Sequence, residues 1–301
     1  MDGRSLRLSV VVCTHNRSAD VAECLAALAQ QTTREPFEIL VVDSGSGAEH
    51  RDSLKQSAER LGVKLIRVDE PGLSKARNVG FAEARGRWVA YLDDDALPRS
   101  DWAEHVFDVI AHAPAEAVMI GGKIVPYWPI SPAPAYVTRR WKLFLSCVED
   151  TDRKSTAKGA NICGANFILD RTRVVDDPPF PEELGRDGLR LIGGEEAYVV
   201  RRLQQKGLDV LYDPSFVVDH KIPDSRLTLK WLRNRSFWEG VTIVKLHDIL
   251  GEPRPLAIHP VKLAISLPIL WLTSKLSRNA DFLIRFNVAY GSLSASLRSV
   301  P

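Results

Sequence analysis

The sequence predicts an α/β protein with a mostly parallel central sheet, flanked by helices and followed by a helical C-terminal region. Short apolar runs alternate with helical segments through the first 125 residues, and such alternation is typical of parallel sheets that carry helices on both faces. The chain has 301 residues, of which 45% are hydrophobic and 26% are charged. That composition is globular, and the length is sufficient for a large core.

Strand-like and helical segments follow one another in regular order. Residues Leu8–Cys13 form an apolar run bounded by polar residues, as expected of a buried parallel strand. In the next segment Val21, Leu25 and Leu28 recur at helical spacing, and Ser18 can cap the helix start. The same reasoning predicts further strands at Phe37–Val42, Val63–Val68, Trp88–Leu92 and Ala117–Val125, and helices at Ser18–Gln31, Glu49–Leu61, Ser74–Ala84 and Asp101–His112.

The second half of the chain is less regular. Pro126–Tyr136 contains four prolines and is therefore expected to be a loop. Beyond it Lys158–Leu169 is strand-like, Glu195–Lys206 is helical, and the chain after Pro223 is expected to be helical. The expected parts are 1–125 for donor binding, 126–222 for the acceptor and catalysis, and 223–301, which is helical and basic.

The net charge of +2 is unevenly distributed along the chain. From Lys221 to the end there are twelve Lys and Arg against five Asp and Glu, a net charge of +7, which leaves −5 for residues 1–220. A basic segment of this kind can bind an anionic membrane or a nucleic acid, or it can be an ordinary solvated face. Because the positive charge lies outside the expected nucleotide-binding edge, we expect no nucleic-acid partner.

The cysteines and the N-terminal segment both favour a cytoplasmic location. The apolar run Leu8–Cys13 is too short for a signal peptide. The cysteines have the spacing of neither a zinc site nor a redox pair; they are Cys13, Cys24, Cys147 and Cys163. A reduced compartment fits both features.

Polar clusters follow four of the predicted strands directly. Ligands of open α/β sheets bind at the carboxyl ends of the strands, so these clusters should meet at one edge. They are Thr14-His15-Asn16-Arg17, Asp43-Ser44-Gly45-Ser46, Asp69-Glu70-Pro71-Gly72 and Asp93-Asp94-Asp95. The first strand lacks the glycine patterns of dinucleotide-binding and ATP-hydrolysing loops, which disfavours both classes.

The aspartate triplet at residues 93–95 indicates a metal site. Three adjacent carboxylates repel one another, and burying them without a cation is costly. A divalent cation that prefers oxygen ligands, Mg²⁺ or Mn²⁺, removes this cost and can bridge a diphosphate. The alternative is an acidic solvated turn.

Two further clusters suit a nucleotide. Asp43 can accept hydrogen bonds from a base or ribose, and Gly45 lets the backbone approach closely; the alternative is a turn cap. The helix start after Gly72 offers free N–H groups to an anion, and Lys75 and Arg77 add positive charge. The alternative there is a solvent-facing basic turn.

A pair of glutamates is the candidate general base. Glu195 and Glu196 follow Gly193 and Gly194 at a predicted helix start, where a substrate can approach closely. The alternative is that the two glutamates only interact favourably with the helix dipole, as acids at helix starts commonly do. His220 follows the strand-like stretch Phe216–Asp219 and gains a functional role only if it folds back towards Asp95.

Taken together and in this order, these motifs resemble the family 2 glycosyltransferases, which have the GT-A fold. The resemblance runs from about Leu8 to Gly240 and is carried by VVCTHNR, VVDSGS, GLSKARNVG, YLDDD, GANFIL, FPEELGRDGLRLIGGEEAYVVRRLQQKG and YDPSFVVDH. It implies an inverting, metal-dependent transfer of sugar from a nucleoside-diphosphate sugar to a saccharide, lipid-linked or small-molecule acceptor. Mg²⁺ or Mn²⁺ would be the cofactor.

The resemblance also implies roles for single residues. Asp43 would hold the base, Asp93 or Asp94 the ribose or diphosphate, and Asp95 the metal with His220 nearby. Glu196 matches the position of a catalytic Asp in the family, and its longer side chain leaves the base open between Glu195 and Glu196. Further residues implied for the donor are Thr14, Asn16, Arg17, Ser74, Arg77 and Asn78, and for the acceptor Asn166 and Gly194.

Two other functions compete with this interpretation. A sugar-nucleotide nucleotidyltransferase needs similar groups but normally has a glycine-rich basic loop near the first strand, and THNRSAD is not one. An inactive sugar-nucleotide or glycan-binding protein would not require the aspartate triplet and the glutamate pair. The sequence leaves the sugar, the base, the acceptor and the oligomeric state open.

An apolar stretch in the C-terminal region suggests contact with the inner face of the cytoplasmic membrane. Leu263–Ser274 has 12 residues, with Lys262 and Lys275 on either side, whereas a spanning helix needs about 20. Because Pro268 also interrupts the stretch, a shallow interfacial helix is expected, with Trp271 at the headgroup level. The alternative is packing in a core or a dimer interface.

Overall fold

The computed structural model describes residues 6–129, 134–149, 155–156, 162–188, 190–277 and 279–297. The chain forms two compact units. The first contains Met1–Tyr127, Ser146–Glu182 and Val199–Lys221, and the second contains Trp128–Leu145, Glu183–Tyr198 and Ile222–Pro301. The middle segment predicted from the sequence, 126–222, is thus divided between the two units.

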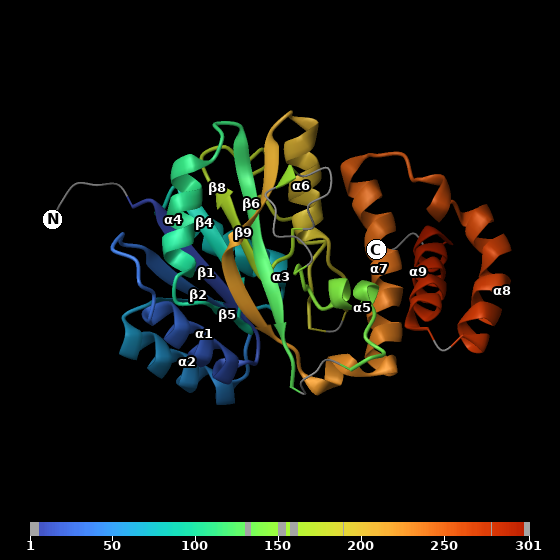
Figure 1. Ribbon diagram of the computed structural model, residues 1–301, viewed down its shortest axis with the longest axis horizontal. Coiled ribbons are helices and arrows are strands. Elements are labelled where there is room, and N and C mark those ends of the chain that lie inside the picture. The colour runs from blue at the N-terminus through green and yellow to red at the C-terminus, as the bar shows by residue number, and fades with distance from the viewer. Residues whose placement is uncertain are drawn as a thin grey trace. The chain divides into compact units, whose positions relative to one another are not determined.

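A nine-stranded sheet forms the centre of the first unit, in the order β3-β2-β1-β4-β8-β6-β9-β5, with β7 paired to β9. Figure 1 shows this sheet with helices beside it. Strands β3, β2, β1 and β4 are parallel, β8 is antiparallel to β4 and β6, and β9 is parallel to β6. Strands β5 and β7 oppose β9, so six strands point one way and three the other. This confirms the mostly parallel α/β prediction. The strands are β1 Leu8–Thr14, β2 Glu38–Ser44, β3 Lys64–Val68, β4 Trp88–Asp93, β5 Ala96–Pro98, β6 Ala117–Tyr127, β7 Ser155–Thr156, β8 Asn166–Asp170 and β9 Asp209–Lys221.

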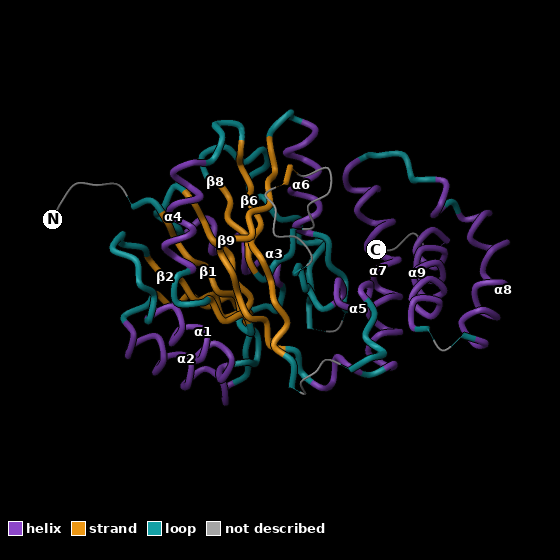
Figure 2. The backbone as a smooth tube through the Cα atoms, viewed as in Figure 1, coloured by secondary structure: helices purple, strands orange, loops and turns teal. Residues whose placement is uncertain are grey.

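Helices cover both faces of this sheet, as Figure 2 shows. Alternate residues of a strand point to opposite faces, and Val10 and Val12 of β1 pack in the core cluster that also contains residues of α1, α2 and α4. Val11 points the other way, towards α3, where a Cβ on Gly80 would lie 2.4 Å from its Cγ1. Glycine therefore permits α3 to approach β1. The helices within this unit are α1 Ser18–Ala29, α2 Ala48–Leu61, α3 Leu73–Glu83 and α4 Trp102–His112. Helix α6, Glu195–Gln205, begins in the second unit and ends in the first.

The second unit is helical after residue 222, as predicted. Helices α7 and α9 approach so closely that a Cβ on Gly240 would lie 2.1 Å from the Val288 carbonyl oxygen, and one on Gly291 would lie 2.0 Å from that of Phe237. None of the described helices is long and apolar enough to cross a membrane. The helices are α5 Arg139–Phe144, α7 Leu229–Leu250, α8 Pro260–Leu276 and α9 Ala280–Leu297, with short 3₁₀ turns at Asp224–Leu227 and Leu256–Ile258.

Several elements differ from the sequence prediction. Strand β6 continues through Pro126, one residue before its end and beyond the stretch paired with β8, where a missing N–H is tolerated. Strand β9 begins at Asp209, well before the predicted Phe216, because shifts in its register with β6 interrupt the simple alternation. The short strands β5 and β7 and the short helix α5 were not predicted. The predicted strand at Lys158–Leu169 is β8, and residues 157–161 lie outside the described part.

Candidate active site at the carboxyl edge of the sheet

Strand pairing brings His220 to the aspartate triplet. β4 ends at Asp93 and β5 begins at Ala96, so Asp94 and Asp95 form the tight connection between them. β5 pairs antiparallel with β9, with Ala96 opposite His220. As a result His220 Nε2 lies 3.1 Å from Asp95 Oδ1, and both side chains are 1% exposed. The condition set from the sequence for His220, that it folds back towards Asp95, is met.

Arg17 bridges Asp94 and Asp95 of this cluster. Its guanidinium donates from Nη1 to Asp94 Oδ1 and from Nη2 to Asp95 Oδ2, both at 2.7 Å. The Thr14 hydroxyl donates to Asp94 Oδ2 at 2.8 Å. Despite Arg17 and Thr14, burial together with the charges of Asp95 and Asp93 raises the pKa of Asp94 to about 7. Burial and the two neighbouring carboxylates therefore disfavour the ionised form of Asp94.

Three side chains have the geometry of a cation site. Asp93, Asp95 and His220 each offer one ligand atom, and these atoms lie within 4.8 Å of one another. His220 Nδ1 is buried and has no hydrogen-bond partner among the described residues. Two carboxylates suit Mg²⁺ or Mn²⁺, and an imidazole is also an acceptable ligand for Mn²⁺. The residues present therefore fit a divalent cation.

The first two strand-end loops are tied together next to this cluster. Asn16 has a positive φ of 56°, its N–H donates to Ser46 Oγ at 2.8 Å, and its Oδ1 accepts from the Gly47 N–H at 2.7 Å. Asp43 accepts from the Ser46 N–H at 3.0 Å and from Arg67 Nη1 at 2.6 Å. Thr14, Asn16, Arg17 and Asp43 thus belong to one edge, as predicted from the strand-end rule.

Arg67 was missed by the sequence analysis. It lies in β3 directly opposite Asp43 of β2, and its side chain is 35% exposed beside that buried carboxylate. A charged residue between apolar neighbours of a strand was the available signal. Its significance depended on the register of the two strands, which the sequence does not show.

The three residues predicted from the start of α3 are buried. Ser74 and Arg77 are both 2% exposed, which excludes the solvent-facing turn for Arg77. The Arg77 guanidinium lies 5.8 Å from the ring centroids of Phe167 and Phe180, and its Nη2 lies 3.5 Å from Asp93 Oδ1. It thus supplies positive charge to Asp93 from within the protein. Lys75, by contrast, pairs with Glu70 at the surface, with 2.7 Å between Nζ and Oε2.

Asn78 holds the loop that carries Phe180. Its amide donates to the Phe180 carbonyl at 2.7 Å and accepts from the Phe180 N–H at 3.0 Å. Both of these hydrogen bonds join Asn78 to the backbone of Phe180. The ring of Phe180 in turn lies beside the Arg77 guanidinium.

The structure corrects the expectation for Asn166, which was predicted to bind the acceptor. Its side chain is 0% exposed. Its Oδ1 accepts from Trp102 Nε1 at 3.0 Å, and its Nδ2 donates to the carbonyls of Lys123 at 3.1 Å and Phe216 at 3.0 Å. Because the amide is fully used inside the core, Asn166 joins β8 to its neighbours and has no access to an acceptor.

The glutamate pair lies in the first turn of α6, in the second unit. Glu195 is 3% exposed, whereas Glu196 is partly exposed. Gly194 has a φ of +96°, and a Cβ there would lie 2.7 Å from Thr242 Cγ2. The Gly193 N–H donates to Thr242 Oγ1 at 3.1 Å. Both glycines therefore fix the backbone that presents the two carboxylates.

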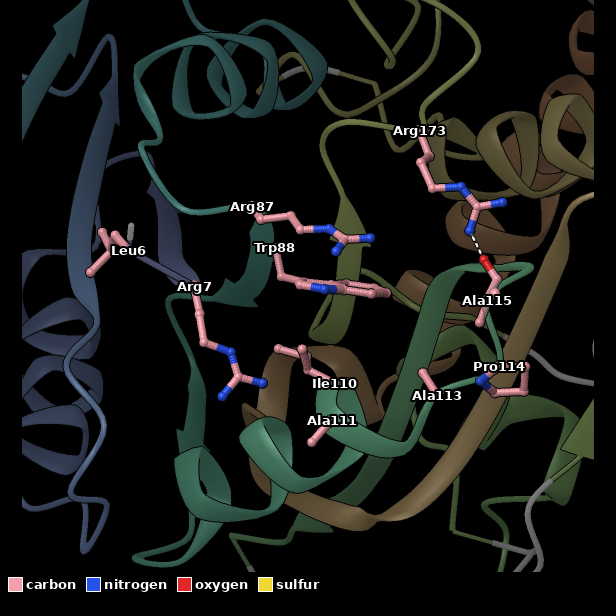
Figure 3. A pocket seen from close by; sticks show the side chains of 11 residues that line it. Leu6, Arg7, Arg87, Trp88, Ile110, Ala111, Ala113, Pro114, Ala115 and Arg173 are labelled. Atoms are coloured by element: carbon pink, nitrogen blue, oxygen red, sulfur yellow. Dashed lines mark hydrogen bonds between the residues drawn. The ribbon is translucent and has the colours of Figure 1, made fainter. Parts of the chain in front are cut away.

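A hollow of about 560 Å³ lies at the opposite edge of the sheet, at the amino ends of β1, β4 and β6 (Figure 3). Arg7 pairs with Glu35, with 2.6 Å between Nη1 and Oε2, and Arg87 pairs with Asp170, with 2.8 Å between Nη2 and Oδ2. Arg173 donates to the Ala115 carbonyl. Since ligands of such sheets bind at the carboxyl ends, this hollow is not the candidate site.

Comparisons with known proteins agree with this geometry. The sequence profile of glycosyl transferase family 2 matches residues 9–170. The glucosyl-dolichyl phosphate glucuronosyltransferase of Haloferax volcanii is 30% identical over 239 residues, 78% of this chain and 75% of that protein. The succinoglycan biosynthesis protein ExoM of Rhizobium meliloti is 25% identical over 254 residues, 80% of this chain and 75% of that protein.

Solved structures show the same fold. A mannosyltransferase of Pyrobaculum calidifontis, determined with GDP-Man and Mn²⁺, superposes with a TM-score of 0.62 at 17% identity, over 98% of this chain and 87% of that one. The family profile covers more than half of the chain, and the Haloferax relative extends the match to most of its length. The chain therefore belongs to glycosyl transferase family 2 and is a glycosyltransferase of the GT-A fold.

Proposed function

We propose that the protein transfers a sugar from a nucleoside-diphosphate sugar to an acceptor hydroxyl, with inversion at the anomeric carbon and with a bound Mg²⁺ or Mn²⁺. The observation that carries the proposal is the meeting of Asp93, Asp95 and His220 at the carboxyl edge of the sheet. Family membership favours it over the nucleotidyltransferase and the inactive binding protein that the sequence alone left open.

The donor would bind along the first strand-end loops. Asp43, oriented by Ser46 and Arg67, would accept hydrogen bonds from the base. Thr14, Asn16, Arg17 and Asp94 line the same edge and would contact the ribose and diphosphate. Arg17 is suited to this role because a guanidinium can bind phosphate oxygens in two-point geometry.

Asp95, His220 and Asp93 would hold the cation. When bound there it would stabilise the negative charge that develops on the leaving diphosphate. Arg77, buried beside Asp93, would hold that carboxylate in its orientation towards the cation.

Glu196 would act as the general base, supported by Glu195. It would take the proton of the acceptor hydroxyl while the hydroxyl oxygen forms a bond to the sugar C1. The bond from C1 to the diphosphate oxygen breaks in the same step, and its electron pair leaves with the nucleoside diphosphate. A single displacement inverts the anomeric configuration and needs no carboxylate nucleophile.

The acceptor is proposed to be lipid-linked and presented at the cytoplasmic face of a membrane. The name of the Haloferax relative describes a dolichyl-phosphate-linked sugar as its acceptor, and the basic C-terminal region of this chain suits an anionic surface. The sugar and the base of the donor are left to experiment.

A thermal-shift panel tests the donor and the cofactor together. UDP-, GDP-, dTDP- and CMP-sugars are compared with and without Mn²⁺, because a ligand that binds the native state raises its apparent stability. We expect one nucleoside-diphosphate class to stabilise the protein, and only with metal. Equal stabilisation with Mn²⁺ and with EDTA, together with full transferase activity in EDTA, would contradict the proposal.

A further inference from the structure

Helix α8 has a continuous apolar face that points away from the protein. Six large apolar side chains on this helix are between 50% and 77% exposed: Val261, Ile265, Ile269, Trp271, Leu272 and Leu276. At about 100° per residue, all but Trp271 fall within an arc of about 80°. Trp271 lies about 80° beyond one edge of this arc. The other five residues form one strip along the length of the helix, bordered by Trp271, and we refer to this strip as the α8 strip.

The opposite side of α8 is already used. Leu263 is buried, and Leu267 and Leu270 pack with it in a cluster that includes Val241 of α7 and Ala289 of α9. The helix is therefore apolar on both sides, whereas the outer face of an ordinary surface helix is polar. An apolar strip of this length on a soluble surface indicates an interaction site.

The charges on α8 indicate what covers the strip. The helix contains no Asp or Glu, and its cations, Lys262 and Lys275, lie near its two ends. Lys275 Nζ lies 6.0 Å from the centroid of the Trp271 ring. Lysines that flank an apolar strip can extend to anionic headgroups, and tryptophan prefers the same interfacial depth.

We infer that the α8 strip docks on the interfacial region of an anionic lipid bilayer, with the helix parallel to the surface. The inference rests on the proposed function and deepens it, because it assigns the surface through which the enzyme would reach a lipid-linked acceptor. The strip enters the boundary between headgroups and acyl chains, while Lys262 and Lys275 pair with lipid phosphates.

A second copy of the chain is a poorer occupant of the same strip. In an antiparallel pair of α8 helices, Lys262 of one copy lies near Lys275 of the other, and in a parallel pair each lysine faces its equivalent. Neither arrangement offers a carboxylate on the helix to offset the repulsion. An anionic bilayer satisfies both lysines at once.

Vesicle co-sedimentation of the full chain tests the inference. Vesicles of phosphatidylcholine alone are compared with vesicles that also contain phosphatidylglycerol, at low and high salt. We expect binding to the anionic vesicles that weakens with salt. The double substitution Ile265→Ser with Ile269→Ser should reduce the binding constant at least about 10-fold, because both side chains leave the interface.

Two matched variants separate the contributions. Lys262→Gln with Lys275→Gln should remove the preference for anionic lipid, whereas Leu229→Ser, which replaces an exposed leucine of α7, should bind as the wild type does. Thermal unfolding of each variant confirms that it folds. The substituted isoleucines point outwards, so their unfolding midpoint should stay close to that of the wild type.

Hydrolysis of the sugar donor without vesicles distinguishes failure of the docking from failure of the enzyme. Unchanged donor hydrolysis in the strip variant, with lost vesicle binding, supports the inference. If the wild type hydrolyses donor but does not sediment with anionic vesicles at low salt, the docking inference is wrong and the proposed function stands. A solution dimer that the strip substitutions dissociate would instead assign the strip to a second copy.

Discussion

The two edges of the sheet carry charge in opposite ways. At the amino edge, Arg7 pairs with Glu35 and Arg87 with Asp170, so each of these cations has its own carboxylate. At the carboxyl edge, Arg17 bridges two aspartates of the triplet, and burial still raises the pKa of Asp94 to about 7. The amino edge therefore carries separate ion pairs, whereas the carboxyl edge gathers three neighbouring carboxylates and has the electrostatic character of a metal-binding site.

Removing a proposed metal ligand from the carboxyl edge should have the largest effect on the rate of sugar transfer. Asp95→Asn is expected to reduce transfer on the order of 10³-fold, because the cation contributes several kcal/mol to stabilising the leaving diphosphate. Initial rates with saturating donor and Mn²⁺ measure this effect. Glu35→Gln at the amino edge is the matched control and should leave the rate unchanged. Near-wild-type turnover of Asp95→Asn would exclude Asp95 as a ligand.

Removing the proposed base should have the next largest effect. Glu196→Gln is expected to lower kcat by about 10²-fold or more, as the loss of general-base catalysis does, with donor binding retained. Donor binding is measured by calorimetry and kcat by initial rates. Glu195→Gln is the matched variant, and an inactive Glu195→Gln beside an active Glu196→Gln would move the assignment by one residue.

Loss of the buried Asn166 amide should lower the stability of the fold and leave acceptor binding intact. Asn166→Ala leaves Trp102 Nε1 and the carbonyls of Lys123 and Phe216 without their partner, at a cost of about 3 kcal/mol in the free energy of unfolding. Urea unfolding measures this cost. If Asn166→Ala has normal stability but a raised KM for the acceptor, the acceptor-binding role predicted for Asn166 from the sequence is correct.

The smallest effect is expected at the amino edge. Arg7 and Glu35 are 41% and 45% exposed, so Arg7→Gln should change the free energy of unfolding by less than about 1 kcal/mol. Transfer rates should be unaffected. A large loss of activity in Arg7→Gln would show that this edge takes part in function and would remove the contrast between the two edges.

The sequence predicted the fold and the position of the acidic cluster well, because both depend on local patterns. The alternation of apolar runs defined the parallel strands, and the strand-end rule placed Asp43 and the aspartate triplet at one edge. The approach of His220 to the aspartate triplet, by contrast, depended on pairing between strands far apart in the sequence. Strand β5 brings His220 to Asp95 across 125 positions, and the three-residue strand has too little pattern to be seen in the sequence.

Burial was the other quantity that the sequence did not show. Asn166 and Arg77 have the side chains of ligand-binding residues, yet Asn166 is fully engaged in the core and Arg77 is buried beside two phenylalanine rings. For α8 the sequence left open a membrane surface, a core and a dimer interface. The structure divides the helix into an inner face that packs and an outer face that is exposed.

Binding of Mn²⁺ at the carboxyl edge tests the central claim most directly. Electron paramagnetic resonance can follow free Mn²⁺ during titration of the protein in the presence of the nucleoside diphosphate selected by the thermal-shift panel. We predict tight binding in the wild type and in Glu35→Gln, weaker binding in His220→Gln, and loss of binding in Asp95→Asn. An identical titration curve for the wild type and Asp95→Asn would contradict the account.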